Sequence, residues 1–406
     1  MDNVKQQIKT PSLLHTRKYL AFWLASLVSN IGSWMQQVAQ PWIILTMSGS
    51  SFMVGLDSFM LNAPGIVFTL WGGILADRLN RKNVILLFQG IQCLSIVILL
   101  VLYLVHALQV WMIIVISLVV GTTDSLSMPS FQSIVPSLVK PKDIPLAITL
   151  NSTQFNLSRM LGPAIAGVLL AKFGAITCFG ANTLSYIPFF VSLYWIYPKK
   201  AEEVKKPQAE ALSRLRDFPV LLRDHKIQGS LATIFVTSFF CAPLITFTPV
   251  LILSIFHGAV GDYGEVMGAF GLGGLLGASM GFIPIPVTMK RNRIASIVAL
   301  FLGITVFTIA LIHSLFLLFA LMVIAGITLT LSNIYVGTYL QEHATNSNRG
   351  KIVSLYQLSL QAGLASGSIS IGILSSHLGI AKALIISGIL AAILHFLILK
   401  RSVSKL

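Results

Sequence analysis

The sequence predicts an all-α integral membrane protein whose twelve transmembrane helices form two six-helix halves. Two properties of the composition support this fold class: 55% of the 406 residues are hydrophobic and only 10% are charged, whereas soluble domains carry about 25% charged residues. The third observation is the order of the chain, in which long apolar runs alternate with short polar breaks. No loop is long enough to fold as a soluble domain, so a soluble enzyme or binding module is excluded.

Twelve apolar runs are each long enough to cross a bilayer, which takes about 20 helical residues. Several exceed that length, so tilted or curved helices are expected. The first run follows a basic segment but is too long for a signal peptide and lacks a small-residue cleavage site, so we expect it to remain as the first span. The runs cover approximately residues 19–46, 54–76, 83–105, 110–135, 144–172, 175–197, 228–256, 263–286, 294–313, 315–340, 351–376 and 380–399.

One long polar stretch separates the first six runs from the last six. The predicted organisation is an N-terminal half (residues 1–197), a cytoplasmic linker (198–227) and a C-terminal half (228–406). Within the linker, leucines and Phe218 recur at near-helical spacing among arginines, which predicts a short amphipathic helix at the inner headgroup level. Pro219 would kink this helix.

The two halves carry matched glycines and prolines, which indicates a duplication. At offsets of 205 and 208 residues the pairs are Gly162 and Gly367, Gly167 and Gly372, Gly174 and Gly379, and Pro41 and Pro249. Because both halves begin on the same side, they are parallel repeats, and a substrate site is expected at their interface near the bilayer midplane. Gly162, Pro163 and Gly167 are the predicted close-packing positions of the fifth span.

The distribution of basic residues sets the predicted topology. Of the 28 Lys and Arg residues, all but Arg159, Lys172 and Lys382 fall in the termini, the linker or the loops that would share one side of the membrane. Cytoplasmic segments carry such an excess, so both termini are predicted to be cytoplasmic. The net charge of +15 is thereby explained by topology, and nucleic acid is not expected as a partner.

A dense charge cluster, running from Gly73 through Asp77, Arg78 and Arg81 to Lys82, lies between the second and third runs. Charge is costly in lipid, so the cluster must form a tight loop at a membrane face. Asp77 could meet the positive end of a helix from the other half, and the arginines could bind carbonyls or acids at inner helix ends. We predict a gate that closes the inner face in one state. The alternative is that these bases only set topology.

Glu342 falls at the inner end of the tenth span, close to basic residues of the same face. It is the predicted inner-gate partner of Arg349 or of the basic loops.

The stretch from Gly73 to Lys82 resembles motif A of the major facilitator superfamily, with Asn80 where a glycine is usual. A weaker copy, Lys290-Arg-Asn-Arg293, lies in the corresponding loop of the second half. The resemblance implies the fold of that superfamily over essentially the whole chain. Finer motifs resemble the branch that includes the bacterial enterobactin exporter and macrolide efflux pumps; they are Trp34-Met-Gln-Gln, Pro41-Trp42, Ser48-Gly-Ser, Val135-Pro136-Ser-Leu-Val and Asn156-Leu-Ser-Arg159-Met-Leu-Gly162-Pro163.

This branch implies proton-driven export of small organic molecules across the bacterial inner (plasma) membrane. Two departures limit what can be carried over. Drug antiporters of the superfamily carry an arginine in the fourth span where this chain has Ser117, and the first span has Ser33 where an acid would be expected. The proton-coupling residues of those relatives therefore do not transfer to this chain.

Two buried charges mark a possible pathway, because charge within a membrane is expensive. Asp124 and Arg159 each lie roughly 21 to 22 Å from their entry face at 1.5 Å per residue, so they could meet near mid-membrane. We hypothesise an ion pair in which protonation of Asp124 releases Arg159 to an anionic substrate. A static pair that fastens two spans together is the alternative. Glu265 is a second candidate for protonation, whereas Asp57, in a near-equivalent place on the second span, is interpreted as solvated or capping.

Amide side chains on inner spans could line the central cavity and bind substrate. In membranes such residues also serve as hydrogen-bond contacts between helices. The candidates are Asn30, Gln36, Gln40, Asn151, Gln154, Asn156, Gln357 and Gln361.

These observations favour a secondary active transporter that exports a siderophore-like molecule or an amphipathic drug by alternating access, as a monomer. A proton-coupled importer and a non-transporting membrane sensor or scaffold are the alternatives. No phosphate-binding loop occurs, so direct use of ATP is excluded. No catalytic constellation, metal cluster or cofactor motif is visible, so an enzyme is not expected.

Overall fold

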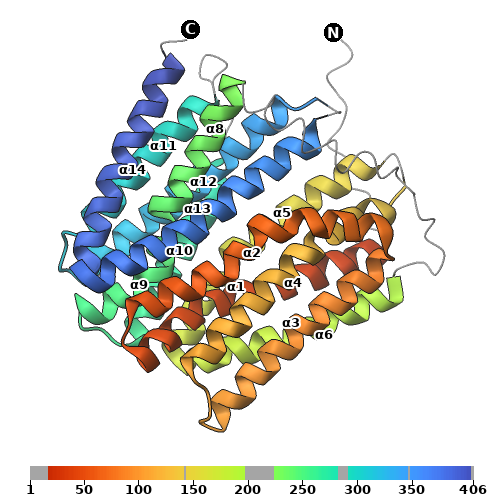
Figure 1. The fold of residues 1–406 in the computed structure, drawn as a ribbon, viewed down its shortest axis with the longest axis horizontal. Coiled ribbons are helices and arrows are strands. Elements are labelled where there is room, and N and C mark those ends of the chain that lie inside the picture. The colour runs from red at the N-terminus through yellow and green to blue at the C-terminus, as the bar shows by residue number, and fades with distance from the viewer. Residues whose placement is uncertain (1–16, 141–142, 197–223, 282–290, 346–347, 404–406) are drawn as a thin grey trace.

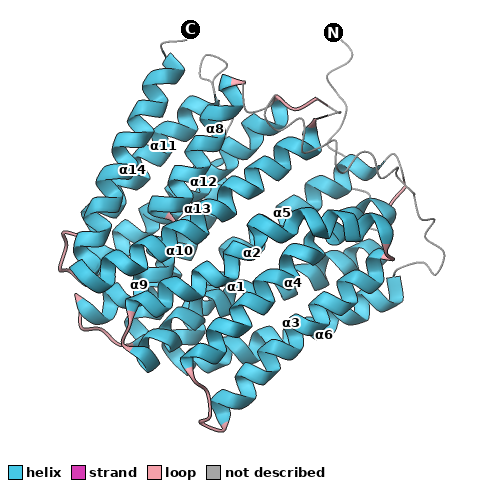
Figure 2. Cartoon of the chain, in the orientation of Figure 1, coloured by secondary structure: helices cyan, strands magenta, loops and turns pink. Residues whose placement is uncertain are grey.

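The computed structural model describes residues 17–140, 143–196, 224–281, 291–345 and 348–403. In this part of the chain the structure is helical, with short connecting loops and no strand (Figure 2). The predicted amphipathic helix of the linker and Lys290 of the second charge cluster lie outside the described residues.

The helices follow the predicted spans in order. The N-terminal half contains α1 (Arg17–Ser48), α2 (Ser51–Arg78), α3 (Arg81–Leu104), α4 (Val110–Ser137), α5 (Ile144–Phe173) and α6 (Ala175–Ile196). The C-terminal half contains α8 (His225–Val236), the π-helical segment η2 (Thr237–Cys241), α9 (Pro243–Ser254), α10 (Val260–Gly281), α11 (Arg291–Ile309), α12 (Leu315–Glu342), α13 (Arg349–Leu378) and α14 (Ile380–Val403).

Nine candidate membrane spans meet a length and apolarity criterion in the described residues, with α8, η2 and α9 counted as one continuous span. The helices α1, α5 and α10 occupy the other three predicted positions but are less apolar. The first two carry several amide side chains each, and α10 is rich in glycine. Such helices suit the interior of a bundle better than contact with lipid.

Local signals at the helix ends explain where the chain turns. Ser50 precedes α2, and its hydroxyl accepts a hydrogen bond from the Met53 amide. Gly174 and Gly379, which the repeat pairs with each other, end α5 and α13 with φ of 79° and 82°. A side chain would strain this left-handed backbone, so glycine is favoured at both positions.

The helices form two bundles, the N-terminal one red to yellow-green and the C-terminal one green to blue in Figure 1. The two bundles contact each other mainly through two helix pairs, α2 with α13 and α5 with α10. We call outer the face that carries the loops after α1, α3 and α5, following the predicted topology.

Three apolar cores stabilise the two bundles. Their positions show at which face of the membrane the two halves pack together. One continuous core joins both halves at the outer ends, where Trp42 and Val54 share it with Phe247 and Tyr263. The two cores at the inner ends are separate: one contains only N-terminal residues such as Phe22, and the other only C-terminal residues. Among the described residues, the halves are therefore sealed together at the outer face and not at the inner face, as in an inward-facing transporter.

Candidate transport site

The first seam between the halves is the crossing of α2 with α13. A Cβ on Gly55 would lie 3.0 Å from the Cα of Gly372, so the two backbones are in direct contact. Next to this contact the Ser58 hydroxyl donates to the Ser368 hydroxyl at 2.9 Å. Further toward the inner face the side chain of Gln361 packs on Gly65, where a Cβ would overlap it.

The second seam is the crossing of α5 with α10, which the repeat relates to the first. A Cβ on Gly167 would lie 2.8 Å from the Cα of Gly268, and one on Gly264 would lie 2.8 Å from the amide nitrogen of Ala171. The repeat partners Gly167 and Gly372 thus serve the same purpose in the two seams: each permits close approach of a helix from the other half. By contrast, Gly162 permits contact within the N-terminal half, against Trp34.

Aromatic packing completes the outer seal. The ring of Trp42 in α1 stacks on that of Tyr263 in α10, with centroids 5.2 Å apart and 13° between the planes. The Tyr263 hydroxyl donates to the Val38 carbonyl at 2.6 Å. The seal is therefore both apolar and hydrogen-bonded.

Arg159 lies near the middle of α5 and faces the other half. Its guanidinium is 5.7 Å from the Trp34 ring centroid, and it interacts electrostatically with Tyr356 of α13. Among the described residues it forms no ion pair. The predicted pair with Asp124 is therefore not formed in this structure, because Asp124 is exposed and its electrostatic neighbour is Tyr186 of α6.

The predicted amide contacts divide into three groups. Gln36, Gln40 and Gln154 are 7%, 6% and 1% exposed in this state, and they hydrogen-bond inside the N-terminal half. Gln361 belongs to the first seam. Four candidates remain accessible in this inward-facing state and are half-buried or exposed: Asn30, Asn151, Asn156 and Gln357.

Asp57 departs most clearly from its interpretation as a solvated or capping residue. Its side chain is 4% exposed, and its Oδ1 accepts a hydrogen bond from the Ser117 hydroxyl at 2.5 Å. Gln40 Nε2 contacts both carboxylate oxygens, at 2.9 and 3.0 Å. The sequence placed Asp57 near a helix end but did not show that side chains of α1 and α4 hydrogen-bond to it in the interior of the bundle.

Two basic residues of motif A, Arg81 and Lys82, contact their own half in this state. The Arg81 guanidinium donates to the Ser133 carbonyl at 3.2 Å, and the Lys82 ammonium lies 4.9 Å from the centre of the Tyr194 ring. Asn80, which replaces the usual glycine, caps α3 by accepting from the amides of Lys82 and Asn83. Such contacts fit a gate that is open at the inner face.

Two further details concern the same loop. A Cβ on Gly73 would meet nothing, whereas one on Gly72 would lie 2.7 Å from the Ser125 carbonyl oxygen, so Gly72 is the glycine that allows α2 to approach α4. The side chains of Asp77 and Arg349 lie outside the described part of the structure.

The other predicted acids lie at the two faces. Glu342 forms an ion pair at 2.5 Å with Arg291, a member of the second charge cluster. Both side chains are partly exposed, and the pair joins α11 to α12 within the C-terminal half. Glu265 is exposed near the outer end of α10.

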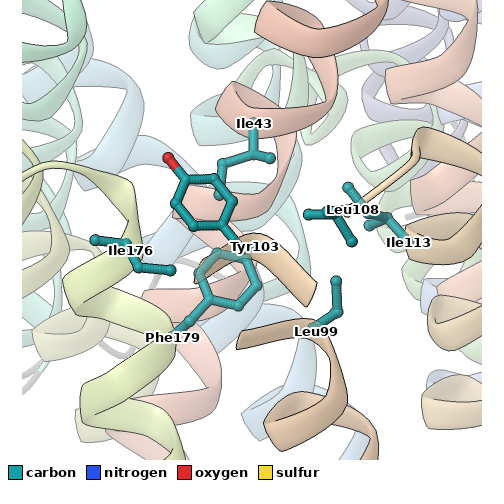
Figure 3. Close-up of a pocket in the computed structure, with 7 residues that line it drawn as sticks. All are labelled: Ile43, Leu99, Tyr103, Leu108, Ile113, Ile176 and Phe179. Carbon is teal, nitrogen blue, oxygen red and sulfur yellow. The ribbon is translucent and has the colours of Figure 1, made fainter. Parts of the chain in front are cut away.

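A small crevice between α1, α3, α4 and α6 near the outer face does not have the properties of a substrate site. Figure 3 shows its lining, which is almost wholly apolar and leaves no space that a water molecule could enter. Ligand pockets usually hold about 300–1,000 Å³ and a few directed polar groups. The lining residues are Ile43, Leu99, Tyr103, Leu108, Ile113, Ile176 and Phe179. In the described residues no group of three His, Cys, Asp or Glu side chains could hold a metal.

Two helical halves that are sealed at one face and part at the other define a membrane transporter of the alternating-access class. Comparison with known proteins gives the family. The chain belongs to the transmembrane secretion effectors of the major facilitator superfamily, whose family model matches residues 10–406. Members of this family are transporters and not enzymes.

The relatives support this assignment over nearly the whole chain. The staphyloferrin A transporter of Staphylococcus aureus is 26% identical over 91% of this chain and 92% of its own length. The enterobactin exporter EntS of Citrobacter koseri is 26% identical over 93% and 90%, respectively. Among solved structures, a bacterial homologue of the human lysosomal transporter Spinster, inward-facing and occupied, matches with a TM-score of 0.69 and 16% identity over 93% of this chain and 95% of that one.

Proposed function

We propose that this protein is a proton-driven exporter that moves a small organic anion, siderophore-like or an amphipathic drug, out of the bacterial cytoplasm by alternating access. The proposal places it in the inner membrane as a monomer, with both termini in the cytoplasm. The observation that carries it is Arg159, a cation without an ion-pair partner among the described residues, held at mid-membrane between the halves. An unpaired cation at that depth is expensive unless it binds an anion.

The surroundings of Arg159 suit a bulky, partly aromatic anion. The Trp34 ring fixes the guanidinium from one side, and Phe155 meets Trp34 edge-on at 6.3 Å between centroids. Tyr356 faces the site from the other half. A carboxylate or phenolate could accept two hydrogen bonds from the guanidinium while its rings lie on the aromatic surface.

The direction of transport is proposed from the relatives and from the state of the structure. EntS is an enterobactin exporter by name. The inner face, where the halves have separate cores, would admit the substrate from the cytoplasm. Closing that face would bring the motif A bases toward helix ends of the other half, and opening the seams would release the substrate outside.

The test uses inverted membrane vesicles, whose outer surface is the cytoplasmic face. With an acidic lumen, vesicles containing this protein should accumulate radiolabelled staphyloferrin A or enterobactin. An uncoupler should abolish the accumulation. The Arg159→Gln protein, verified by its amount in the membrane, should lose the accumulation, whereas Arg159→Lys should keep part of it. Equal accumulation with and without the proton gradient would overturn proton-driven export, and full activity of Arg159→Gln would overturn the anion site.

A further inference from the structure

A continuous hydrogen-bonded chain of side chains crosses the interior of the N-terminal half and ends on a carboxylate. Asn182 Nδ2 donates to Gln36 Oε1 at 2.7 Å, and Gln36 Nε2 donates to Gln40 Oε1 at 3.1 Å. Gln40 Nε2 lies 2.8 Å from the Ser117 Oγ and also contacts Asp57. We call these five residues, from α6, α1, α4 and α2, the carboxylate network. All are at most 7% exposed.

The carboxylate network surrounds Asp57 with neutral partners only. No Lys, Arg or His of the described residues lies within 4 Å of the carboxylate. Asp57 sits six residues, or roughly 9 Å, from the outer end of α2, within the membrane. A charged carboxylate that is enclosed in this way without a cation is strongly disfavoured relative to its protonated form.

The helices packed on α2 bring few titratable groups toward Asp57. On α4 the nearest is Asp124, seven residues, or roughly 10 Å, along the helix from Ser117. The basic residues and Tyr19 of α1 lie at its inner end, and α9 has no titratable side chain. Those of α13 are Arg349, Lys351 and Tyr356 in its inner part and His377 at the outer end, and those of α3 are Arg81, Lys82, Cys93 and Tyr103.

The segment of α2 that carries Asp57 also forms the first seam. Gly55 and Ser58, on either side of it, contact Gly372 and Ser368 of the other half. One turn of helix thus presents the carboxylate to the N-terminal half and its neighbours to the C-terminal half. A change in the charge of Asp57 acts directly on the contact that seals the outer face.

We propose that Asp57 is the proton-binding residue of this transporter and that its protonation favours the outer-sealed, inward-facing state. This deepens the proposed function, on which it rests. A proton from the external solution binds the carboxylate while the outer face is open and hydrated. The neutral carboxyl group is then enclosed when the seams close, and deprotonation makes the sealed state unfavourable again. The proton returns to water, and no other reactant is consumed.

The repeat provides a matched control. Glu265 of α10 occupies a near-equivalent place in the C-terminal half, but its side chain is exposed and forms no hydrogen bond with another of the described residues. Substituting it by Gln removes the same charge on the same face without altering an enclosed group. The comparison of Asp57→Asn with Glu265→Gln therefore separates the enclosed carboxylate from acidic charge in general.

The experiment measures the distance between the two halves at the outer face, in the absence of substrate. Spin labels at Ala107 and His313, in exposed outer loops of the two halves, report the distance across the outer face by pulsed electron paramagnetic resonance. The three native cysteines are replaced first. In wild-type protein in lipid nanodiscs, the ratio of sealed to open molecules should rise as pH falls from 8 to 5, by about tenfold or more. The Asp57→Asn protein should stay sealed at every pH, with less than about a twofold change.

Two controls decide the result. Glu265→Gln should retain the wild-type response, and Ser117→Ala, which removes a hydrogen bond to the charged form, should move the midpoint of the response to higher pH. A full pH response in correctly folded Asp57→Asn, or its loss in Asp124→Asn alone, would overturn the assignment. Because the readout needs no substrate, a pH-dependent closure without proton-driven export would refute the proposed function and leave this inference standing.

Discussion

Substitution of Gly167 by alanine should open the outer face, because the added methyl group falls between the two halves. A Cβ at Gly167 would lie 2.3 Å from the Gly264 carbonyl oxygen and 2.6 Å from the Gly268 amide nitrogen. Both distances are shorter than real Cβ atoms show. Reaching an ordinary contact of at least 3.4 Å requires α5 and α10 to separate by about 1.1 Å.

The magnitude follows from the cost of overpacking, about 1–3 kcal/mol for an added methyl group that backbone must accommodate. The seam exists only while the outer face is sealed, so this cost falls on the sealed state alone. The ratio of sealed to open molecules should therefore fall by about 5- to 150-fold. Gly268→Ala is the matched control in the same crossing, because a Cβ at Gly268 would meet no atom within 4 Å.

The assay is the distance between spin labels at Ala107 and His313 in nanodiscs. Gly167→Ala should shift the distribution toward longer distances, and Gly268→Ala should leave it unchanged. Both substitutions gain the same helix propensity, so their difference isolates the seam. An unchanged distribution in Gly167→Ala, or equal shifts in both proteins, would refute the account of the sealed state.

Three further predictions concern other parts of the molecule. Ser58→Cys combined with Ser368→Cys should form a disulfide under oxidation, because the hydroxyl oxygens are 2.9 Å apart; transport should stop and return on reduction, and a cross-linked protein that still transports would contradict the seam. Arg159→Gln should weaken binding of an anionic substrate by about 10- to 100-fold, the range for a hydrogen bond to a charged group, as measured by isothermal titration with staphyloferrin A; an unchanged affinity would contradict the anion site. Asn80→Ala should lower the free energy of unfolding by about 1 kcal/mol and Asn80→Gly by only a few tenths, seen as the order of their thermal melting points; equal melting points would contradict the cap.

The sequence was sufficient for the fold because lipid imposes one rule on every span. An apolar run that crosses the bilayer must be helical, because only then do its backbone amides and carbonyls hydrogen-bond within the run. The spans and the breaks between them can therefore be recognised in the sequence alone. The offset between the two halves could also be recognised in the sequence, because close helix packing requires glycine at the same positions of both repeats. They predicted that Gly174 and Gly379 are related, and both end their helices in the left-handed region.

The site was less predictable because burial within a bundle depends on which face each helix turns inward. The depths of Asp124 and Arg159 were estimated from residue counts, but depth does not fix direction, and the two side chains face different neighbours. Asp57 was misread for the same reason. A signal for it existed in Gln40, Ser117 and Asp57 together, three polar residues at similar distances from the outer ends of their helices.

The most direct test of the central claim, that protonation of Asp57 drives export, is a proton flux measurement in proteoliposomes. With a pH-sensitive dye inside, adding staphyloferrin A to the cytoplasmic face should produce a proton movement in the opposite direction to the substrate. The flux should be absent in Asp57→Asn and preserved in Glu265→Gln. Substrate movement without any proton flux in wild-type protein, or an undiminished flux in Asp57→Asn, would contradict the claim.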